Sequence, residues 1–171
     1  MAIFLLNFFY VYFCVLMKNR IVLLENVRSA YNVWNIIRTA DALWWDVWLS
    51  WYTPHPDEQI KVIKTSLGAE NTVWLKRFDD TKQAIEFARK NDFFIIAWEI
   101  TKNAISLDLV NNEEWIFKSE GNIILILWNE VDGVLKSTLD VADRVVYIPM
   151  KWVKESLNVG QSAAIFMWWL R

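Results

Sequence analysis

One stretch decides the fold class of this chain: Ile123-Ile124-Leu125-Ile126-Leu127-Trp128-Asn129-Glu130. Its first five residues form a continuous apolar run, which is typical of a parallel strand buried on both faces. Residues 93–97 form a second run of this kind. The polar residues Asn129 and Glu130 follow the first run directly, and ligand sites of parallel sheets lie beyond the carboxyl ends of the strands. The stretch therefore predicts a buried parallel strand and places a candidate site directly after it.

Apolar runs of strand length alternate with helical patterns along the rest of the chain. Val33, Ile36, Ile37 and Ala40 recur at helical spacing, and Asp80 is a candidate N-cap for a later helix. The predicted strands are residues 21–24, 46–51, 73–78, 93–97, 123–127 and 144–148. The predicted helices are residues 32–43, 57–66, 81–90 and 158–170. This alternation predicts an α/β fold, a parallel sheet flanked by helices on both faces, in a single domain.

The first 17 residues differ in composition from the rest of the chain. Residues 2–17 are apolar except for Asn7, and they are slightly short for a membrane span, which needs about 20 residues. They also lack the basic segment and the cleavage site of a signal peptide. We interpret residues 1–17 as an N-terminal extension from a translation start assigned too far upstream, with a membrane anchor as the alternative. Residues 18–171 are the predicted domain.

Charge, cysteine and histidine content narrow the function classes. The formal net charge is −2 at pH 7, so any nucleic-acid binding would depend on local Lys and Arg patches. The single cysteine, Cys14, permits no intrachain disulfide and is consistent with a cytoplasmic location. With His55 as the only histidine, the chain offers no ligand set for zinc, and we expect no metal.

Three motifs follow one another in a characteristic order, at residues 32–41, 123–133 and 147–158. In sequence, order and spacing they resemble the signature motifs of the SpoU/TrmH family of RNA ribose 2'-O-methyltransferases, from residue 18 to the C-terminus. The resemblance implies S-adenosylmethionine as the cofactor, tRNA or rRNA as the substrate, a homodimer, and a C-terminal segment tied in a deep trefoil knot. A catalytically inactive RNA-binding or scaffold protein of the same fold is the alternative.

Tryptophan stands where the motifs of that family carry glycine, at Trp34, Trp128 and Trp152. The chain contains 12 Trp and only 4 Gly in 171 residues, whereas glycine averages about 7% of residues in proteins. An indole is also poorly suited to positions where backbone must approach a ligand. We hypothesise that UGA codons, written here as Trp, are decoded as Gly in the source organism. A chain that is truly rich in Trp, with a filled and inactive cofactor pocket, is the alternative.

The hypothesis covers some of the other tryptophans and leaves the rest open. It extends to a group around a turn and a strand, Trp44, Trp45, Trp48 and Trp51. It stays open for Trp74, Trp98, Trp115, Trp168 and Trp169. Intact-mass measurement of the native protein would distinguish the two readings.

The resemblance also implies which residues form the site. The catalytic candidates are Asn32, Arg38, Glu130, Ser156 and Asn158. The cofactor-binding candidates are Leu127, Trp128, Asn129, Ile148, Met150, Ser156 and Leu157, with a further contribution from residues 97–101. The RNA-binding candidates are Arg28, Arg38, Lys151 and Lys154, and Arg28 is a candidate for a contact across subunits. Backbone groups at the strand ends are expected to contact the adenine.

Arg38 is, by resemblance, the key catalytic arginine, and we expect it on the helix face of Asn32 or the neighbouring face. An arginine is a poor base because its pKa exceeds about 12. We assign it to gripping the phosphate next to the target ribose, since the guanidinium fork matches a phosphate. The alternative is a solvent-exposed arginine in an ion pair with Asp41 or Glu130.

Other candidates have structural alternatives as well. Glu130 and Asn158 could act as helix caps, and capping by Asn158 is compatible with a role in the site. The side chains of Ile148 and Leu157 could simply pack in the core. These alternatives stay open at the level of the sequence.

Overall fold

The computed structural model describes residues 19–56, 69, 72–110, 121–128, 133–151, 153 and 156–170. The strands are β1 (Arg20–Glu25), β2 (Asp46–Leu49), β3 (Leu75–Arg77), β4 (Phe93–Trp98), β5 (Ile105–Ser106), β6 (Asn122–Trp128) and β7 (Arg144–Tyr147). The helices are α2 (Ala30–Leu43), α4 (Thr81–Lys90), α5 (Leu107–Val110), α7 (Lys136–Leu139) and α8 (Val159–Trp169). Within this part of the chain, no helix combines the length and the apolarity needed to cross a bilayer.

The strands form one seven-stranded sheet in the order β3-β2-β1-β6-β4-β7-β5. Every pair of neighbours is parallel. The central strand β6 is paired along its length with β1, from Ile123 opposite Arg20 to Trp128 opposite Glu25. The continuous apolar run in β6 is thus the buried parallel strand that the sequence predicts. Its neighbours on both sides also read as apolar runs.

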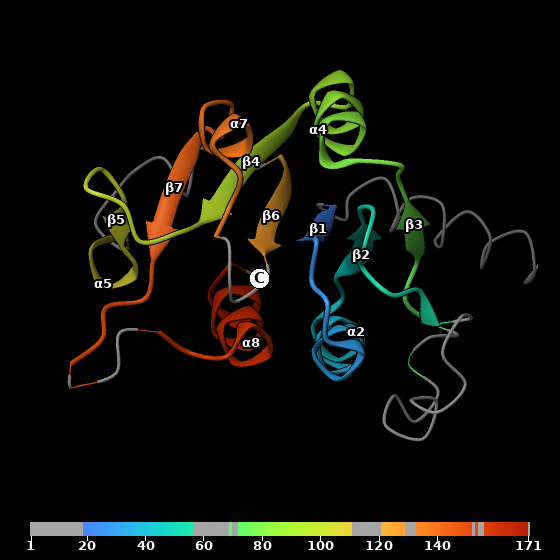
Figure 1. Cartoon of the computed structure of the whole chain (residues 1–171), viewed down its shortest axis with the longest axis horizontal. Helices are drawn as coiled ribbons and strands as arrows, with labels where there is room; N and C mark the ends of the chain where they lie inside the picture. Colours follow the sequence, from blue (N-terminus) through green and yellow to red (C-terminus); the bar gives the residue numbers. More distant parts are fainter. Residues whose placement is uncertain are drawn as a thin grey trace, which may run out of the picture.

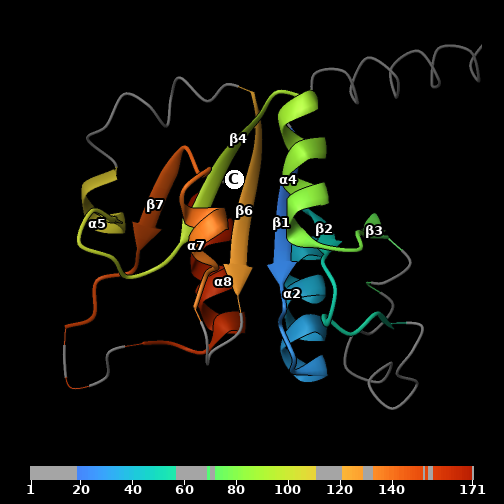
Figure 2. The same ribbon diagram turned by 45° about the horizontal axis from the view of Figure 1, so that its top comes forward.

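Helices cover both faces of the sheet, as the strand and helix alternation predicts. Figure 1 shows α2 and α8 side by side on one face and α4 and α7 on the other, and Figure 2 shows the same three layers from a second direction. Successive strand residues point to opposite faces. Val22 and Leu24 therefore pack toward α2 and α8, whereas Ile21 and Leu23 pack toward α4.

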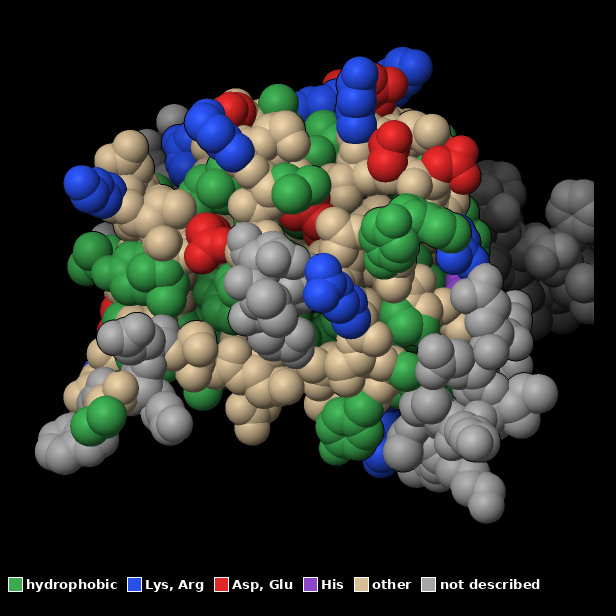
Figure 3. Space-filling model, in the orientation of Figure 1, with side chains coloured by type: hydrophobic (Ala, Val, Ile, Leu, Met, Phe, Trp, Pro, Cys, Tyr) green, Lys and Arg blue, Asp and Glu red, His purple; other side chains and the backbone are tan. Residues whose placement is uncertain are grey.

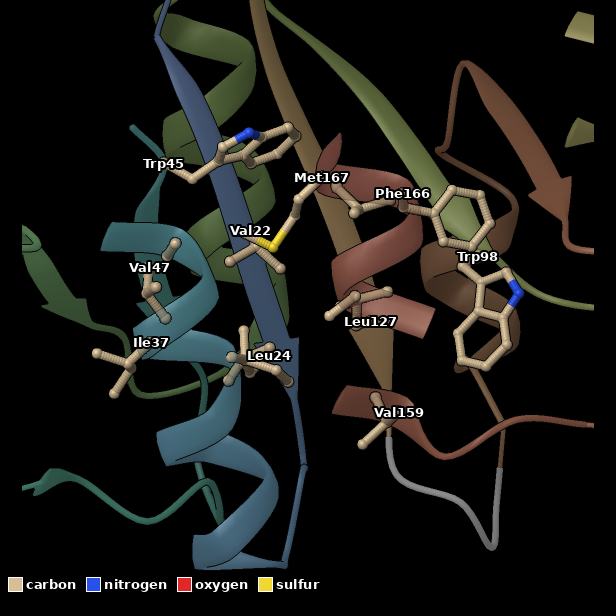
Figure 4. Close-up of a cluster of buried hydrophobic side chains, with 14 of the residues drawn as sticks. Val22, Leu24, Ile37, Trp45, Val47, Trp98, Leu127, Val159, Phe166 and Met167 are labelled. Atoms are coloured by element: carbon tan, nitrogen blue, oxygen red, sulfur yellow. The ribbon is translucent and has the colours of Figure 1, made fainter. Parts of the chain in front are cut away.

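The larger core lies between the sheet and the α2–α8 layer. Val22, Leu127, Phe166 and Met167 are all fully buried there, and Figure 4 shows their side chains gathered between β1, β6 and α8. Burial of apolar surface contributes about 25 cal/mol per Å2. This packing holds α2 beside α8 and so fixes how the starts of these two helices meet.

The sequence explains where two of the helices begin, because each has a capping residue there. Asp80 caps α4, because its Oδ1 accepts a hydrogen bond from the backbone N–H of Gln83 at 2.8 Å, which confirms the predicted cap. Ser29 caps α2 through a hydrogen bond from the backbone N–H of Asn32. A serine or aspartate at this position satisfies a backbone donor that the helix itself cannot pair.

Some elements differ from those predicted. β2 ends at Leu49 because the next residues form a turn, in which the N–H of Thr53 donates to the carbonyl of Ser50 at 3.0 Å. The predicted strand at residues 73–78 is shortened to β3. The short elements β5, α5 and α7 were not predicted, since two to four residues carry no readable periodicity. The predicted helix at residues 57–66 lies outside the described residues.

Candidate active site

The carboxyl ends of three neighbouring strands lie at one edge of the sheet. β4 pairs with β6 on one side and with β7 on the other, all in parallel. Trp98, Trp128 and Tyr147 therefore end their strands at the same edge, where parallel α/β sheets bind their ligands. The segments that the sequence predicts for the cofactor begin at these ends. The topology thus brings them together from three distant parts of the chain.

Asn32 and Asn158 meet where α2 and α8 begin. The Nδ2 of Asn158 donates a hydrogen bond to the Oδ1 of Asn32 over 3.2 Å. Asn158 is also the N-cap of α8, and its Oδ1 accepts from the backbone N–H of Gly160 at 2.9 Å. The Asn32 side chain is buried. These two predicted residues are therefore in direct contact, and Asn158 caps a helix at the same time.

Arg38 does not share the face of Asn32. Six residues along an α-helix leave two side-chain directions about 120° apart, and Arg38 is exposed whereas Asn32 is buried. The structure therefore excludes a shared face, whereas a separation of about 120° corresponds to a neighbouring face. The ion pairs of the described residues do not include one between Arg38 and Asp41, and the Asp41 carboxylate accepts from the hydroxyl of Thr72. Among the described residues, Arg38 makes no hydrogen bond or ion pair.

Arg38 belongs instead to an outward stripe of α2. Tyr31, Asn35 and Arg38 are all exposed, and their spacing of four and three residues places them on one helix face. Asn35 lies against the start of α8, because a Cβ atom added to Gly160 would come within 2.9 Å of its Nδ2. Only glycine fits at position 160 without a shift of its neighbours. The outward stripe therefore runs beside the Asn32–Asn158 contact.

The cofactor candidates divide between core and surface. The Leu127 side chain is fully buried in the core, so only its backbone is available to a ligand. Ile148 is partly buried and packs against the larger core, which was its structural alternative. Met150 and Leu157 are also partly buried, and Ser156 is exposed. Asn129, Glu130, Trp152 and Lys154 lie outside the described residues, so their predicted roles stay predictions.

Two indoles lie across the ends of β4 and β6. The rings of Trp98 and Trp128 stack with centroids 5.7 Å apart and planes 18° apart. The Nε1 of Trp128 donates to the backbone carbonyl of Trp98 at 2.8 Å. Trp98 also packs on Phe166 of α8, at 6.0 Å between ring centroids, and Figure 4 shows these two rings side by side. The indole pair therefore covers backbone that a ligand at this edge would need.

Two carboxylates that the sequence analysis missed secure the start of α7. Glu25, at the end of β1, accepts from the N–H of Leu135 at 3.2 Å and from the hydroxyl of Thr138 at 2.8 Å. Glu99, after β4, accepts from the N–H of Val134 at 2.9 Å. Both strands flank β6, so the chain that returns after β6 is held from both sides. An acidic residue at the end of a buried strand, or directly after it, is the sequence pattern that could have indicated Glu25 and Glu99. From this pattern, only Glu130 is predicted.

The RNA-binding candidates in the described part are surface residues. Arg28 and Lys151 are exposed. On the face seen in Figure 3, the Lys and Arg side chains are spread among Asp and Glu side chains rather than gathered in one basic stripe. This distribution agrees with the small negative net charge. On this face, phosphate contacts would therefore be local.

A hollow of about 550 Å3 lies apart from the predicted site. Tyr52, Thr81 and Leu135 are among the residues that line it, and none of the predicted site residues does. Over the described stretches, no group of three or more His, Cys, Asp or Glu side chains is placed to hold a metal ion.

Comparison with known proteins agrees with the motifs. The chain is 25% identical over 152 residues to a tRNA (guanosine(18)-2'-O)-methyltransferase of Aquifex aeolicus, covering 88% of this chain and 68% of that protein. It is 29% identical over 150 residues to the enzyme of the same name from Thermus thermophilus, covering 85% of this chain and 71% of that protein.

Solved structures share this fold. An AdoMet-bound rRNA methyltransferase from Sinorhizobium meliloti superposes with a TM-score of 0.79 at 21% identity, covering 91% of this chain and 57% of that chain. A model of the SpoU rRNA Methylase family matches residues 19–168. That match spans nearly the whole chain and includes all three motifs. The chain therefore belongs to the SpoU rRNA methylase family.

Proposed function

We propose that this protein is an S-adenosylmethionine-dependent RNA ribose 2'-O-methyltransferase that acts on tRNA or rRNA. The family match over residues 19–168 carries this proposal. The relatives from Aquifex aeolicus and Thermus thermophilus are named as tRNA 2'-O-methyltransferases. The reaction joins the methyl group of the cofactor to a ribose 2'-hydroxyl. Holding the two reactants in line supplies much of the acceleration in such a transfer.

The described edge fits part of the cofactor site and conflicts with another part. At the end of β7, Ile148 and Met150 are partly buried, and we propose that their backbone groups contact the adenosyl group. At the ends of β4 and β6, the stacked rings of Trp98 and Trp128 do not leave such room.

The roles of the polar residues follow from their positions. The Asn32–Asn158 hydrogen bond ties α2 to the start of α8, so we propose that this pair positions the site rather than reacting. Arg38 is exposed and would reach the phosphate beside the target ribose. Its guanidinium donates in a fork that matches phosphate oxygens. We further propose that Glu130 and Ser156 complete the site.

We propose a homodimer, because the family resemblance implies one and exposed apolar residues lie on two adjacent helices, α2 and α8. The outward sides of α2 and α8 carry exposed apolar residues, with Tyr31 66%, Ile165 38% and Trp168 56% exposed. An apolar face of this kind on two adjacent helices suits a second copy. In such a pair, Arg38 and Arg28 of one subunit would act beside the cofactor site of the other.

The trefoil knot and the cytoplasmic location remain parts of this proposal. Family membership supports the knot, in which the segment after β7 would pass through a loop before α8. Action on tRNA or rRNA supports the cytoplasm.

Methyl transfer from radiolabelled S-adenosylmethionine to total tRNA and to rRNA tests the proposed function. Arg38→Ala should lower the rate by roughly 100-fold or more, as expected when a transition-state charge contact is lost. Lys90→Ala, at an exposed position at the end of α4 and before the amino end of β4, is the matched control and should keep the normal rate. A near-normal rate in Arg38→Ala would reject the catalytic role of this arginine. Mapping of 2'-O-methyl sites with and without the gene would identify the RNA.

The second candidate function is a catalytically inactive RNA-binding or scaffold protein. The indole pair at Trp98 and Trp128 favours it, because both rings lie at the edge where the cofactor would bind. Absence of methyl transfer together with retained RNA binding would support this alternative.

A further inference from the structure

Trp98 is buried together with a polar group that has no hydrogen-bond partner. Its side chain is 4% exposed, and its Nε1 has no hydrogen-bond partner. A buried indole N–H normally finds an acceptor, and a buried donor without one costs the desolvation of that group. The same defect recurs at Trp45 and Trp48, which are buried with unpaired Nε1 atoms. Three buried tryptophans with the same defect point to a common cause.

Trp44 has a backbone conformation that is unfavourable for tryptophan. It ends α2 with φ of 59° and ψ of 44°, in the left-handed region. The N–H of Trp45 then donates to the carbonyl of Ala40 at 2.9 Å. This six-to-one hydrogen bond defines a Schellman ending, in which the left-handed residue is usually glycine. An indole there costs conformational energy that glycine would not.

The ends of β4 and β6 combine these observations at the candidate site. The carbonyl of Trp98 is engaged by the indole of Trp128, and the two rings stack over the strand ends. If both positions carried glycine, the strand ends would present bare backbone at the edge where a parallel sheet receives its ligand. The strands themselves would persist, because their pairing uses backbone groups alone.

We infer that the functional protein carries glycine at positions 98 and 128. The indole rings of Trp98 and Trp128, as the sequence is printed, close its cofactor site. The inference rests on the proposed function, since a protein that binds no cofactor has no need of an open edge. It extends the decoding hypothesis to position 98, which the sequence alone left open. The ratio of 12 Trp to 4 Gly in the chain agrees with glycine rather than another small residue.

Peptide masses from the native protein provide the first test. Trypsin should release residues 91–102, with position 98, and residues 119–136, with position 128. Each is expected at the mass calculated with glycine. Indole-containing masses for both peptides would overturn the inference. This result does not depend on activity: glycine-containing protein that transfers no methyl group to RNA would refute the proposed function and leave the inference standing.

Cofactor binding by two recombinant forms provides the second test. Calorimetric titration with S-adenosylmethionine compares the chain as written with the Trp98→Gly/Trp128→Gly variant. The variant should bind roughly tenfold more tightly or better. Trp74→Gly, at a position 53% exposed and outside this edge, is the control and should match the written chain. Equal affinity of the written chain and the double variant would overturn the inference. Should the variant fail to fold, the peptide masses decide.

Discussion

Asp46 shows how a partly buried carboxyl group is tolerated at the amino end of β2. Burial raises the pKa of the Asp46 carboxyl group, and a hydrogen bond from the N–H of Trp74 opposes the rise. That hydrogen bond spans 3.2 Å to Oδ1. The folded protein therefore holds the Asp46 proton more tightly than the unfolded chain does. Stability falls as pH rises from the ordinary aspartate pKa, about 3.9, to the raised value, and the cost is constant above it.

Asp46→Asn should remove this pH dependence, because the amide oxygen can still accept from Trp74 and carries no charge. We expect the variant to melt at a higher temperature than the wild type near neutral pH. The difference should shrink as pH falls through that window. Thermal unfolding followed by circular dichroism at a series of pH values measures it. A difference that does not change with pH would contradict the assignment to Asp46.

Glu25 illustrates a buried acid whose role is structural. It is 1% exposed, and its two oxygens accept from Leu135 and Thr138. Glu25→Ala would leave those two donors without their acceptor, so we expect a loss of roughly 1–3 kcal/mol in the free energy of unfolding. Urea denaturation measures it.

Glu86→Ala is the matched control for that prediction. Glu86 lies on α4 with an exposed side chain, 4.0 Å from Lys82, and such a surface pair contributes roughly 0.3–0.5 kcal/mol. If Glu25→Ala were no more destabilised than this control, the two hydrogen bonds would not hold α7 as described.

Among the helices and strands, the C-terminus of α2 gives the clearest prediction about stability. The left-handed residue at its C-terminus is Trp44, and its side chain is 77% exposed. Trp44→Gly should therefore raise the free energy of unfolding by roughly 1 kcal/mol, since it removes the left-handed cost and little packing. Urea denaturation of the variant and the written chain checks this value.

Trp74→Gly is the control for the helix ending. Trp74 is similarly exposed, at 53%, and it is absent from the residues with positive φ. Glycine there gains no conformational relief and adds chain entropy to the unfolded state. Its stability should stay level or fall. Equal destabilisation of both variants would show that position 44 does not require glycine.

For the protein as a whole, the proposed homodimer leads to a testable prediction. Ile165→Asp places a charge on the proposed α2–α8 interface, where burial without a partner is costly. We expect the wild type to have twice the mass of the chain in light scattering coupled to size exclusion, and the variant to have the mass of one chain. Leu109→Asp, on α5 at a position 59% exposed, should stay dimeric. A monomeric wild type would contradict the dimer.

Most elements of the fold were readable because their patterns are long. The apolar run of β6 and the helical spacing in α2 extend over enough residues to separate strand from helix. The capping role of Asp80 was readable from one side chain. The site was less readable: the sequence left open which face of α2 carries Arg38, and the role of Glu25 was not foreseen. Both depend on which way a side chain points in the packed protein.

The α/β class, the family and the identity of the site candidates can be read from the amino-acid sequence, because periodicity and motifs are local properties of the chain. Which of these candidates meet depends on the folded protein. It joined Asn32 to Asn158 across 126 positions, turned Arg38 outward, and stacked Trp98 on Trp128. These outcomes follow from parallel pairing of β4, β6 and β7 and from the packing of α2 on α8. Such contacts between distant segments have no counterpart in local sequence patterns.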